Sequence, residues 1–357
     1  MINLKIIFMD IQRLKTILLG GLVASSIFFS SGCAKEGGID TSSAAKDFIE
    51  AWIKEFHPEA TRAGLGIYIL EDKPGTGAGL TDDDFFVFVE YTATDLDGNI
   101  SSTTDERLSQ QVGTYAAADY YGADVLIRDR YYSPVGVLEM IDGMRVGGVR
   151  KAVIPGWLNV NDDYKTAEEY EKKGSGSNII YTISMKGKTS DITQWEIDSL
   201  GRYVMINMGM APSDSVFKGY YSKTLKQPTD TATFGADTNF YIHYTGRLLN
   251  GHVFDTSIED TAKVHGIYSA SKAYSPMYVS PAEDGYENYT IASDATSTGS
   301  TTVKGFAYCL SKLRPFEKVV CAFYSELGYG YSGSGSSIPK FAPLVFEIEV
   351  VPEPESD

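Results

Sequence analysis

The chain has 357 residues, 43% of them hydrophobic, and a formal net charge of −16. This length and composition suffice for two domains of ordinary size, each with its own core. The negative charge argues against nucleic acid and anionic lipid headgroups as partners, because long-range repulsion opposes both. The four histidines and three cysteines form neither an HExxH nor a Cys/His ligand pattern, so we expect no metal and no cofactor.

Residues 1–32 have the pattern of a secretory signal peptide. Arg13 and Lys15 precede an apolar run over residues 17–29, which is too short to span a bilayer. The following Ser31-Gly32-Cys33 resembles the lipobox of bacterial lipoproteins. That resemblance implies a lipid on Cys33 as the only membrane contact, and a location in the cell envelope, on the periplasmic face or the surface side of the outer membrane. Ordinary cleavage with an incidental cysteine is the alternative.

Residues 33–58 are predicted to form a tether followed by a short helix. Residues 34–43 are small and polar, which is typical of a flexible linker. The start of this stretch, Ala34-Lys35-Glu36, resembles the charged tether of some surface lipoproteins of Bacteroidota. Apolar residues from Ala45 to Phe56 then recur at helical spacing, with Ser42 or Ser43 as the expected N-cap. We expect this helix to pack on the next domain.

Residues 59–189 form a first strand-rich unit. Phe85–Tyr91 is dense in aromatic and β-branched residues, and Asp97-Gly98 is a strong hairpin signal because glycine readily takes a positive φ. Residues 135–144 are expected to form a short helix, and residues 149–155 and 178–185 are expected to form strands. The Asp95–Asn99 stretch lacks the spacing of an EF-hand, so we predict a turn there and no calcium site.

A helical linker over residues 190–212 is predicted to lead into a second strand-rich unit over residues 213–351. This unit has its own hairpin signal at Asn250-Gly251 and a strand over residues 344–350. Residues 257–302 are long and rich in Tyr, Ser, Thr and Gly, so we expect a loop or flap and not core. Cys309 and Cys321 are compatible with a disulfide or with two buried free thiols.

The two units repeat each other. Residues 91–98 and 244–251 both read Tyr-Thr-x-x-x-Leu-x-Gly, and the second copy continues into Val253-Phe254-Asp255. Gly328-Tyr329-Gly330, Ile338-Pro339 and the strand over 344–350 follow in order. This ordered set resembles the FKBP-type peptidyl-prolyl cis-trans isomerases. The resemblance implies an α+β fold with two FKBP-like domains, each a twisted antiparallel β-sheet wrapped around a short α-helix, joined by a helical linker.

The resemblance also assigns a site in the second domain. The residues in catalytic positions are Tyr244, Asp255 and Tyr329, and those in substrate-binding positions are Phe254, Val303, Phe306, Ile338 and Phe346. Rotating an X-Pro bond needs no nucleophile or metal, only a dry apolar cup that holds the twisted amide better than the planar one. Aromatic walls with one carboxylate and one phenol at the rim suit that requirement. The family's Gly-Glu turn is Phe316-Glu317 here, so we expect that turn to be built differently or Phe316 to meet another surface.

The first domain keeps Tyr91, Gly136 and Tyr181 at matching positions but has Ser101 and Ser102 in place of Phe254 and Asp255. We therefore predict that it is inactive, with self-association or client binding left as its role. The resemblance implies unfolded or Pro-containing polypeptides as clients and a macrolide as a pocket ligand. The alternative to a lipid-anchored isomerase and chaperone is a surface lipoprotein that binds peptides through FKBP-like folds without turnover.

Overall fold

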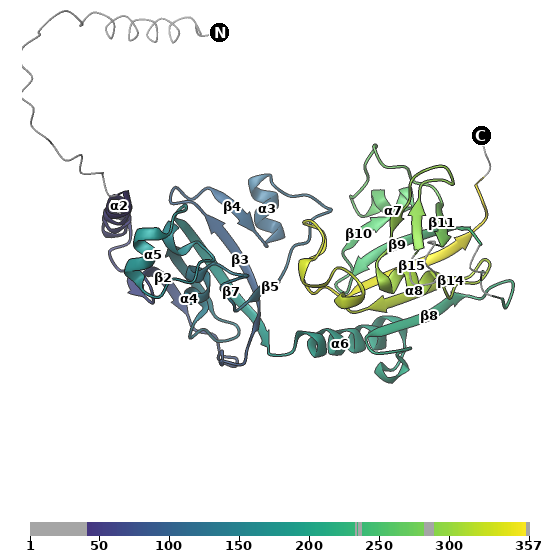
Figure 1. The fold of residues 1–357 in the computed structure, drawn as a ribbon, viewed down its shortest axis with the longest axis horizontal. Coiled ribbons are helices and arrows are strands. Elements are labelled where there is room, and N and C mark those ends of the chain that lie inside the picture. The colour runs from purple at the N-terminus through teal and green to yellow at the C-terminus, as the bar shows by residue number, and fades with distance from the viewer. Residues whose placement is uncertain (1–40, 233, 235–237, 282–288, 355–357) are drawn as a thin grey trace, which may run out of the picture.

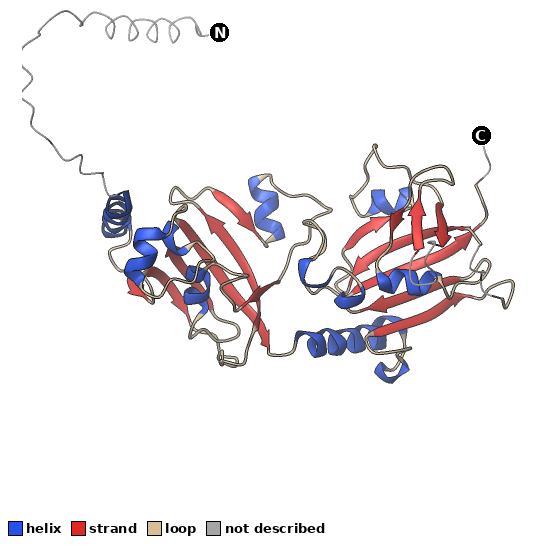
Figure 2. Cartoon of the chain, in the orientation of Figure 1, coloured by secondary structure: helices blue, strands red, loops and turns tan. Residues whose placement is uncertain are grey.

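The described residues form two antiparallel β-sheets with helices packed on them, joined by helix α6 (Ile192–Tyr203) (Figures 1 and 2). The computed structural model describes residues 41–232, 234, 238–281 and 289–354. The α+β class predicted from the sequence is confirmed, since all strand pairs in both sheets are antiparallel. The predicted signal peptide, Cys33 and the first part of the tether lie outside the described residues. In the described ranges, no helix combines the length and the apolar character needed to cross a membrane.

The N-terminal helix α2 spans Thr41–Phe56 and packs on the first sheet through Ile49 and Ile53, which are buried. Two details of the sequence prediction are wrong here. The helix already begins at Thr41, so residues 41–43 belong to it and not to the tether, and Ser42 and Ser43 lie inside the helix where an N-cap would precede it. The apolar spacing began only at Ala45, and helix propagation is favourable beyond the apolar stripe once the helix is anchored.

The first sheet has the strand order β1-β2-β6-β7-β3-β4, and β5 pairs with β3. Its strands are β1 (Thr61–Ala63), β2 (Ile67–Lys73), β3 (Phe86–Thr94), β4 (Ile100–Thr103), β5 (Asp124–Ile127), β6 (Val149–Ile154) and β7 (Ile179–Thr189). Helix α4 (Val135–Ile141) buries most of its residues in the core of this sheet. The shorter helices α3 (Glu106–Val112) and α5 (Ala167–Lys173) and the turn η1 (Gly156–Leu158) flank it.

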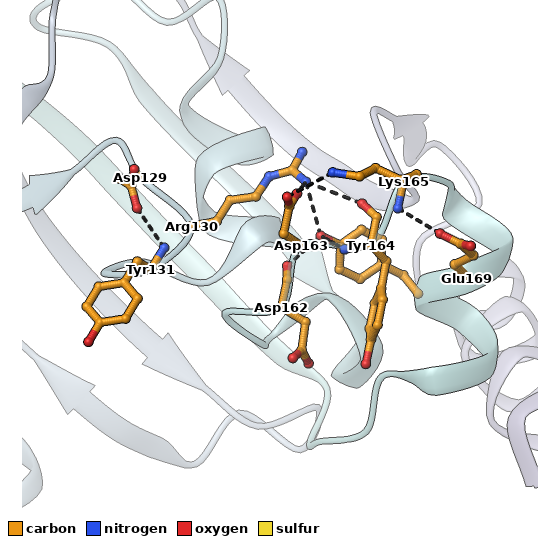
Figure 3. A network of polar contacts seen from close by, with 9 residues as sticks. Asp129, Arg130, Tyr131, Asp162, Asp163, Tyr164, Lys165 and Glu169 are labelled. Atoms are coloured by element: carbon orange, nitrogen blue, oxygen red, sulfur yellow. Dashed lines mark hydrogen bonds and ion pairs between the residues drawn. The ribbon is translucent and has the colours of Figure 1, made fainter.

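The loops after β5 and β6 of the first sheet are tied together by a polar network (Figure 3). Arg130 Nη1 donates to Asp163 Oδ1 at 2.5 Å and to the Tyr170 hydroxyl at 3.3 Å. Tyr170 is fully buried, and its hydroxyl donates to the Asp162 carbonyl at 2.6 Å. The segment after β6 is thereby held against α5.

Helix α6 (Ile192–Tyr203) joins the two sheets and continues into a π-helical turn, Val204–Met208. The predicted helical linker runs to residue 212, but this helix ends at Met208. The following Gly209 has a φ of +60°, the left-handed conformation that terminates helices. The far end of α6 packs on the second sheet, where Leu200 and Val204 meet Tyr221, Ala322 and Val345.

The second sheet has the strand order β13-β12-β11-β9-β15-β14-β8, and β10 pairs with β9. Its strands are β8 (Tyr220–Lys226), β9 (Phe240–Leu248), β10 (Val253–Thr256), β11 (Met277–Pro281), β12 (Tyr289–Ala292), β13 (Ser300–Thr301), β14 (Lys318–Phe323) and β15 (Leu344–Val351). Helix α8 (Lys304–Leu310) packs on the sheet, and α7 (Glu259–Val264) follows β10.

The prediction that residues 257–302 form a loop without core residues is wrong in part. β11 from this segment pairs with β9 in the main sheet, and Val279 and Tyr289 are buried in the second core. The strand signal was hidden, because three short strands lie between polar turns and the window contains no long alternating run. The segment therefore widens the sheet by β11, β12 and β13.

The loop that follows β14 reaches from the second sheet to the first, as the yellow segment between the two sheets in Figure 1. The Phe341 ring packs edge-on against Phe86, with centroids 5.3 Å apart. The Ser336 carbonyl accepts from the Tyr120 amide at 2.8 Å, and Lys340 lies 3.9 Å from Asp124. We call residues 330–343 the docking loop, because its contacts join the two halves of the molecule.

Candidate active site

The hairpin of β9 and β10 provides one side of the site. A register shift between Val253 and Asp255 marks a β-bulge, and both Phe254 and Asp255 line the same cavity. Successive residues of a regular strand face opposite sides, so the bulge is what brings these two neighbours to one side. Across the hairpin, the Tyr244 hydroxyl donates to Asp255 Oδ2 at 2.6 Å. Tyr244 and Asp255 thus form a fixed pair in the cavity wall.

Gly246 on β9 is required by the aromatic packing. A Cβ atom at this position would lie 2.6 Å from the Phe254 ring and 2.8 Å from the Phe346 ring. Because glycine leaves this space free, the two rings meet edge-on with centroids 5.6 Å apart. Phe346 also packs against Phe306, at 4.7 Å, so one ring on β15 joins the wall to the floor.

Helix α8 brings the floor into place. Gly305 lies so close to the sheet that a Cβ atom would be 2.5 Å from the Phe323 ring. This close approach carries the neighbouring Phe306 into the core, where it is 3% exposed and contacts Tyr244 at a centroid distance of 5.7 Å. Val303, the N-cap of the helix, lines the cavity as well.

The segment after β14 supplies the remaining side of the cavity. Tyr329 follows the turn η4 (Ser325–Leu327) and is 39% exposed, so its hydroxyl lies at the rim. Ile338 is buried and is held by a pair of hydrogen bonds with the Ser334 backbone, at 2.8 and 3.1 Å. The glycines on both sides of Tyr329 fit the sharp course of the chain, and Gly330 has a φ of +58°.

These elements enclose a cavity of about 320 Å³. Every site residue predicted from the sequence lines it: Tyr244, Phe254, Asp255, Val303, Phe306, Tyr329, Ile338 and Phe346. The volume lies in the usual range of small-ligand sites. Its lining combines aromatic rings with the hydroxyl groups of Ser300, Thr301, Thr302, Ser334 and Ser337. The arrangement can hold a proline ring among Phe254, Phe306 and Phe346 while the Tyr329 hydroxyl reaches a neighbouring carbonyl.

The sequence reasoning missed residues from the 257–302 segment. Ile291, Thr301 and Thr302 line the cavity, and the Lys272 ammonium forms an ion pair with Asp255. Asp255 therefore meets a phenol on one side and an ammonium on the other. No signal in the sequence pointed to Lys272, because it lies in a segment that the family motif does not cover and that we had taken for a loop.

Both phenols in the site are neutral hydrogen-bond donors near pH 7. Burial, followed by the charge of Asp255 and the hydrogen bond to it, raises the pKa of Tyr244 well above its ordinary value. Burial and then the charge of Asp255 also raise the pKa of Tyr329. A protonated Tyr329 can donate to a carbonyl of a bound peptide but cannot act as a base.

The described residues show no grouping of three or more His, Cys, Asp or Glu side chains that could hold a metal ion. Cys309 and Cys321 are both buried free thiols, which settles the alternative left open by the sequence. Burial raises the pKa of Cys321 well above its ordinary value, so this thiol is an apolar core group.

The turn at Phe316-Glu317 has an unusual backbone for a residue with a side chain. Phe316 has a φ of +58°, a conformation that costs a residue with a side chain about 1–2 kcal/mol, and its ring is 41% exposed. Glu317 is buried and accepts from Arg314 at 2.7 Å and from Thr224 at 2.8 Å. Phe316 therefore holds a left-handed backbone conformation that glycine would adopt without strain.

The first sheet repeats the hairpin with other side chains. Ser102 pairs with Ala93 as Asp255 pairs with Gly246, so Ser101 and Ser102 occupy the positions of Phe254 and Asp255, as the alignment of the repeats predicted. The Tyr91 hydroxyl lies 3.2 Å from Ser102 Oγ, where the second hairpin has its Tyr244–Asp255 bond. The corresponding cavity measures about 180 Å³ and is lined by Tyr91, Val137 and Tyr181, with Lys340 of the docking loop across it.

Comparison with known proteins finds sequence similarity to FKBP-type peptidyl-prolyl isomerases. No family model matches the chain. A probable FKBP-type peptidyl-prolyl cis-trans isomerase of Haemophilus influenzae is 29% identical over 110 residues, which is 31% of this chain and 33% of that protein. The FKBP-type 22 kDa isomerase of Escherichia coli K12 is 27% identical over 31% of this chain and 38% of its own, and a macrophage infectivity potentiator of Trypanosoma cruzi is 27% identical over 32% and 43%.

The chain thus spans about a third to two fifths of the length of these curated relatives. The names of the Haemophilus influenzae and Escherichia coli relatives confirm the resemblance to FKBP-type isomerases that the sequence motifs indicated. Among solved structures, the three FKBP domains of wheat FKBP73 align over 80% of this chain and 93% of theirs, with 13% identity and a TM-score of 0.27. FkpA from E. coli aligns over 42% and 60%, with 19% identity and a TM-score of 0.29.

Proposed function

We propose that the chain is an FKBP-type peptidyl-prolyl cis-trans isomerase whose reaction site is the aromatic cavity of the second domain. One observation carries the proposal: the residues that the family motif assigns to the site, scattered from Tyr244 to Phe346, line one cavity. The sequence similarity to proteins named as FKBP-type isomerases supports the same activity.

The cavity would act by differential binding. The barrier to rotation about an X-Pro bond is about 18–20 kcal/mol, because the planar amide loses its conjugation when it twists. A cup of Phe254, Phe306 and Phe346 removes water from the prolyl ring, and a twisted amide needs less hydration at its carbonyl than a planar one. The Tyr329 hydroxyl would donate to a carbonyl of the substrate and fix its orientation.

Asp255 would hold the rim in shape. Its two oxygens are engaged by Tyr244 and Lys272, so its charge is compensated and its position is fixed. A carboxylate held in this way lines the cavity without opening it to water. Lys272 comes from the segment between β10 and β11, and its release from Asp255 would give a substrate access to the carboxylate.

The competing function is peptide binding without turnover. The strained Phe316 turn and the ion pair of Lys272 with Asp255 favour it, because each departs from the family pattern. In that case the cavity would hold a proline-containing segment of a client without changing its isomerisation rate.

The two functions are separated by one experiment with the full chain. Exchange NMR on a short Leu-Pro peptide measures the isomerisation rate with and without a macrolide that competes for the cavity. Acceleration that the macrolide suppresses supports the isomerase. Peptide binding that the macrolide displaces, with an unchanged exchange rate, would establish the binding module instead.

The membrane anchor, the location and the clients of the chain are part of the same proposal. The chain would be held in the cell envelope by a lipid on Cys33, on the periplasmic face or the surface side of the outer membrane, and would act on unfolded or Pro-containing polypeptides. Metabolic labelling with a palmitate analogue, compared between the wild type and Cys33→Ser, tests the anchor, since only the wild type should carry label.

A further inference from the structure

A second, larger cavity lies between the docking loop and the first sheet. It measures about 460 Å³. One wall is formed by β4 and the segments around it, including Ser101, Ser102 and Thr103, and the opposite wall by Ser336 and Pro339 of the docking loop. Its volume lies in the range of ligand sites. It includes Ser101 and Ser102, which replace the site residues Phe254 and Asp255 in the first domain. We call it the interdomain groove.

The interdomain groove and the aromatic cavity share one wall. Ser334 and Ser337 of the docking loop line the aromatic cavity, Gly335 and Ser336 line the groove, and Ile338 lines both. Neighbouring backbones pack about 5 Å apart, and an extended chain advances about 3.3 Å per residue. A polypeptide whose proline occupies the aromatic cavity would therefore reach the groove within a few residues.

The lining of the groove suits an uncharged chain. Of its lining residues, Asp119 accepts from the Ser336 hydroxyl at 2.5 Å, and Asp124 lies 3.9 Å from Lys340. Asp124 is thus paired with Lys340 across the groove, whereas Asp119 is held by a neutral hydroxyl. The other polar groups are hydroxyls, which both donate and accept hydrogen bonds, as the backbone of a peptide requires.

One wall is also the edge of a sheet. β4 is the last strand in the order of the first sheet, so one edge of its backbone has no strand partner within the described part of the chain. Such an edge offers N–H and C=O groups in the spacing of an extended chain. The docking contacts of Ser336 with Tyr120, at 2.8 Å, and of Phe341 with Phe86 keep the opposite wall in place.

We propose that the interdomain groove is a second binding site, which takes the uncharged extended segment of polypeptide flanking the X-Pro bond. The inference rests on the proposed isomerase function, because it uses the aromatic cavity to place the proline. It gives the first domain a part in choosing substrates although that domain has no reaction site of its own.

The test uses the full chain and two uncharged Leu-Pro peptides. The short peptide has about four residues. The long peptide has about twelve residues and, fully extended, spans about 40 Å at about 3.3 Å per residue. Ser102→Trp fills the groove from an exposed position, and Ser177→Trp, also exposed but away from the groove, is the matched control. Exchange NMR gives kcat/KM for each peptide. We expect Ser102→Trp to lower the ratio of long-peptide to short-peptide kcat/KM about tenfold, and Ser177→Trp to leave that ratio unchanged.

An unchanged ratio in Ser102→Trp overturns the inference while the isomerase stands. If the wild type accelerates neither peptide, the proposed isomerase function fails, and fluorescence anisotropy with the labelled long peptide then decides on the groove alone. In that measurement Ser102→Trp must raise the Kd about tenfold over Ser177→Trp. Equal Kd values for the two variants would contradict a binding groove.

Discussion

The β3–β4 and β9–β10 hairpins have the same backbone register and different side chains. In both, a pair of threonine hydroxyls lies 2.9 Å apart, Thr92 with Thr103 and Thr245 with Thr256. The neighbouring position is a tyrosine in each, but Tyr91 meets Ser102 whereas Tyr244 meets Asp255. The fold thus depends on the shared tyrosine, threonine and glycine positions, and the candidate site depends on the two positions where the hairpins differ.

The segments after β6 and β14 differ even more. After β6, the chain turns through η1 into α5 and is tied to Arg130 and the buried Tyr170. After β14, it carries Tyr329 to the rim of the aromatic cavity and then continues as the docking loop. In the first domain no counterpart of Tyr329 faces the cavity of about 180 Å³, and Lys340 from the second domain lines that cavity instead.

The largest difference in kcat/KM is expected between variants that remove the site residues of the second domain and a variant that removes the matching ring of the first domain. Tyr329→Phe with Phe346→Ala removes a hydrogen bond of about 1 kcal/mol and an aromatic wall of about 2–3 kcal/mol, so kcat/KM should fall several-hundred-fold. Tyr181→Ala removes the ring that takes the place of Phe346 in the first sheet and should leave kcat/KM for a short peptide unchanged.

Circular dichroism and thermal melting must show that each variant is folded, because Phe346 is buried and its loss also destabilises the fold. Phe346→Leu retains more of the core and should still lower kcat/KM in the Tyr329→Phe background. Equal losses from the Tyr181 and Phe346 variants, both folded, would remove the distinction between the two domains.

The two halves should respond to pH with opposite sign. Burial raises the pKa of Glu196 to about 7, although it accepts from the Ser325 amide at 2.6 Å and the Ser325 hydroxyl at 2.8 Å. The folded state then holds a proton that the unfolded state has lost above pH 4.5, so stability falls as the pH rises from 4.5 to about 7. The loss is up to about 3 kcal/mol, at 1.36 kcal/mol per pKa unit.

Asp84 of the first sheet behaves in the reverse way. Burial would raise its pKa, but hydrogen bonds from Lys188, at 2.5 Å, and from Thr81 outweigh burial and lower it. Its contribution to stability is present above pH 3.8 and is lost as the pH falls through the lowered value. Segment-resolved hydrogen exchange at pH 5 and pH 8 tests this for Glu196→Gln. We expect the variant to show stronger protection than the wild type in the second sheet at pH 8 and equal protection at pH 5.

The turn before the second-last strand of each unit gives a smaller effect. Gly147, two residues before β6, has a φ of +83°, and Phe316, two residues before β14, has a φ of +58°. Phe316→Gly should therefore raise the free energy of unfolding by about 0.5–1 kcal/mol, after the entropic cost of glycine is set against the relieved strain. Urea titration measures it. A loss of stability would mean that the Phe316 ring has contacts worth more than the strain.

The smallest effect is expected from transplanting side chains into the first hairpin. Ser101→Phe with Ser102→Asp, made in the Tyr329→Phe/Phe346→Ala background, should give no measurable isomerisation. Val137 still stands in the place of Phe306, and no phenol corresponds to Tyr329. If activity appeared, the hairpin alone would be sufficient for the site and the segment after β14 would be dispensable.

Much of the fold and of the site could be predicted because the signals are local and ordered. The repeated Tyr-Thr-x-x-x-Leu-x-Gly pattern located both hairpins, and Gly98 and Gly251 have the positive φ that their turns required, +87° and +91°. The order of the aromatic residues from Tyr244 to Phe346 matches the family motif, and this resemblance was enough to predict that they line one cavity.

The features that could not be predicted from the sequence depend on contacts between distant segments. Lys272 reaches Asp255 from a segment without periodicity, and β11 to β13 are too short to stand out between their turns. The interdomain groove exists only because Ser336 and Phe341 dock on the first sheet, and no pattern in residues 330–343 indicates that partner. The strain at Phe316 was likewise invisible, because it follows from the backbone that the neighbouring strands impose.

The central claim is that the aromatic cavity of the second domain, and not its counterpart in the first, receives the X-Pro bond. A crystal structure of the chain with a short Leu-Pro peptide tests it most directly. We predict that the prolyl ring lies among Phe254, Phe306 and Phe346, with a peptide carbonyl within hydrogen-bonding distance of the Tyr329 hydroxyl. A peptide bound instead beside Tyr91 and Tyr181, with the second cavity empty, would contradict the account.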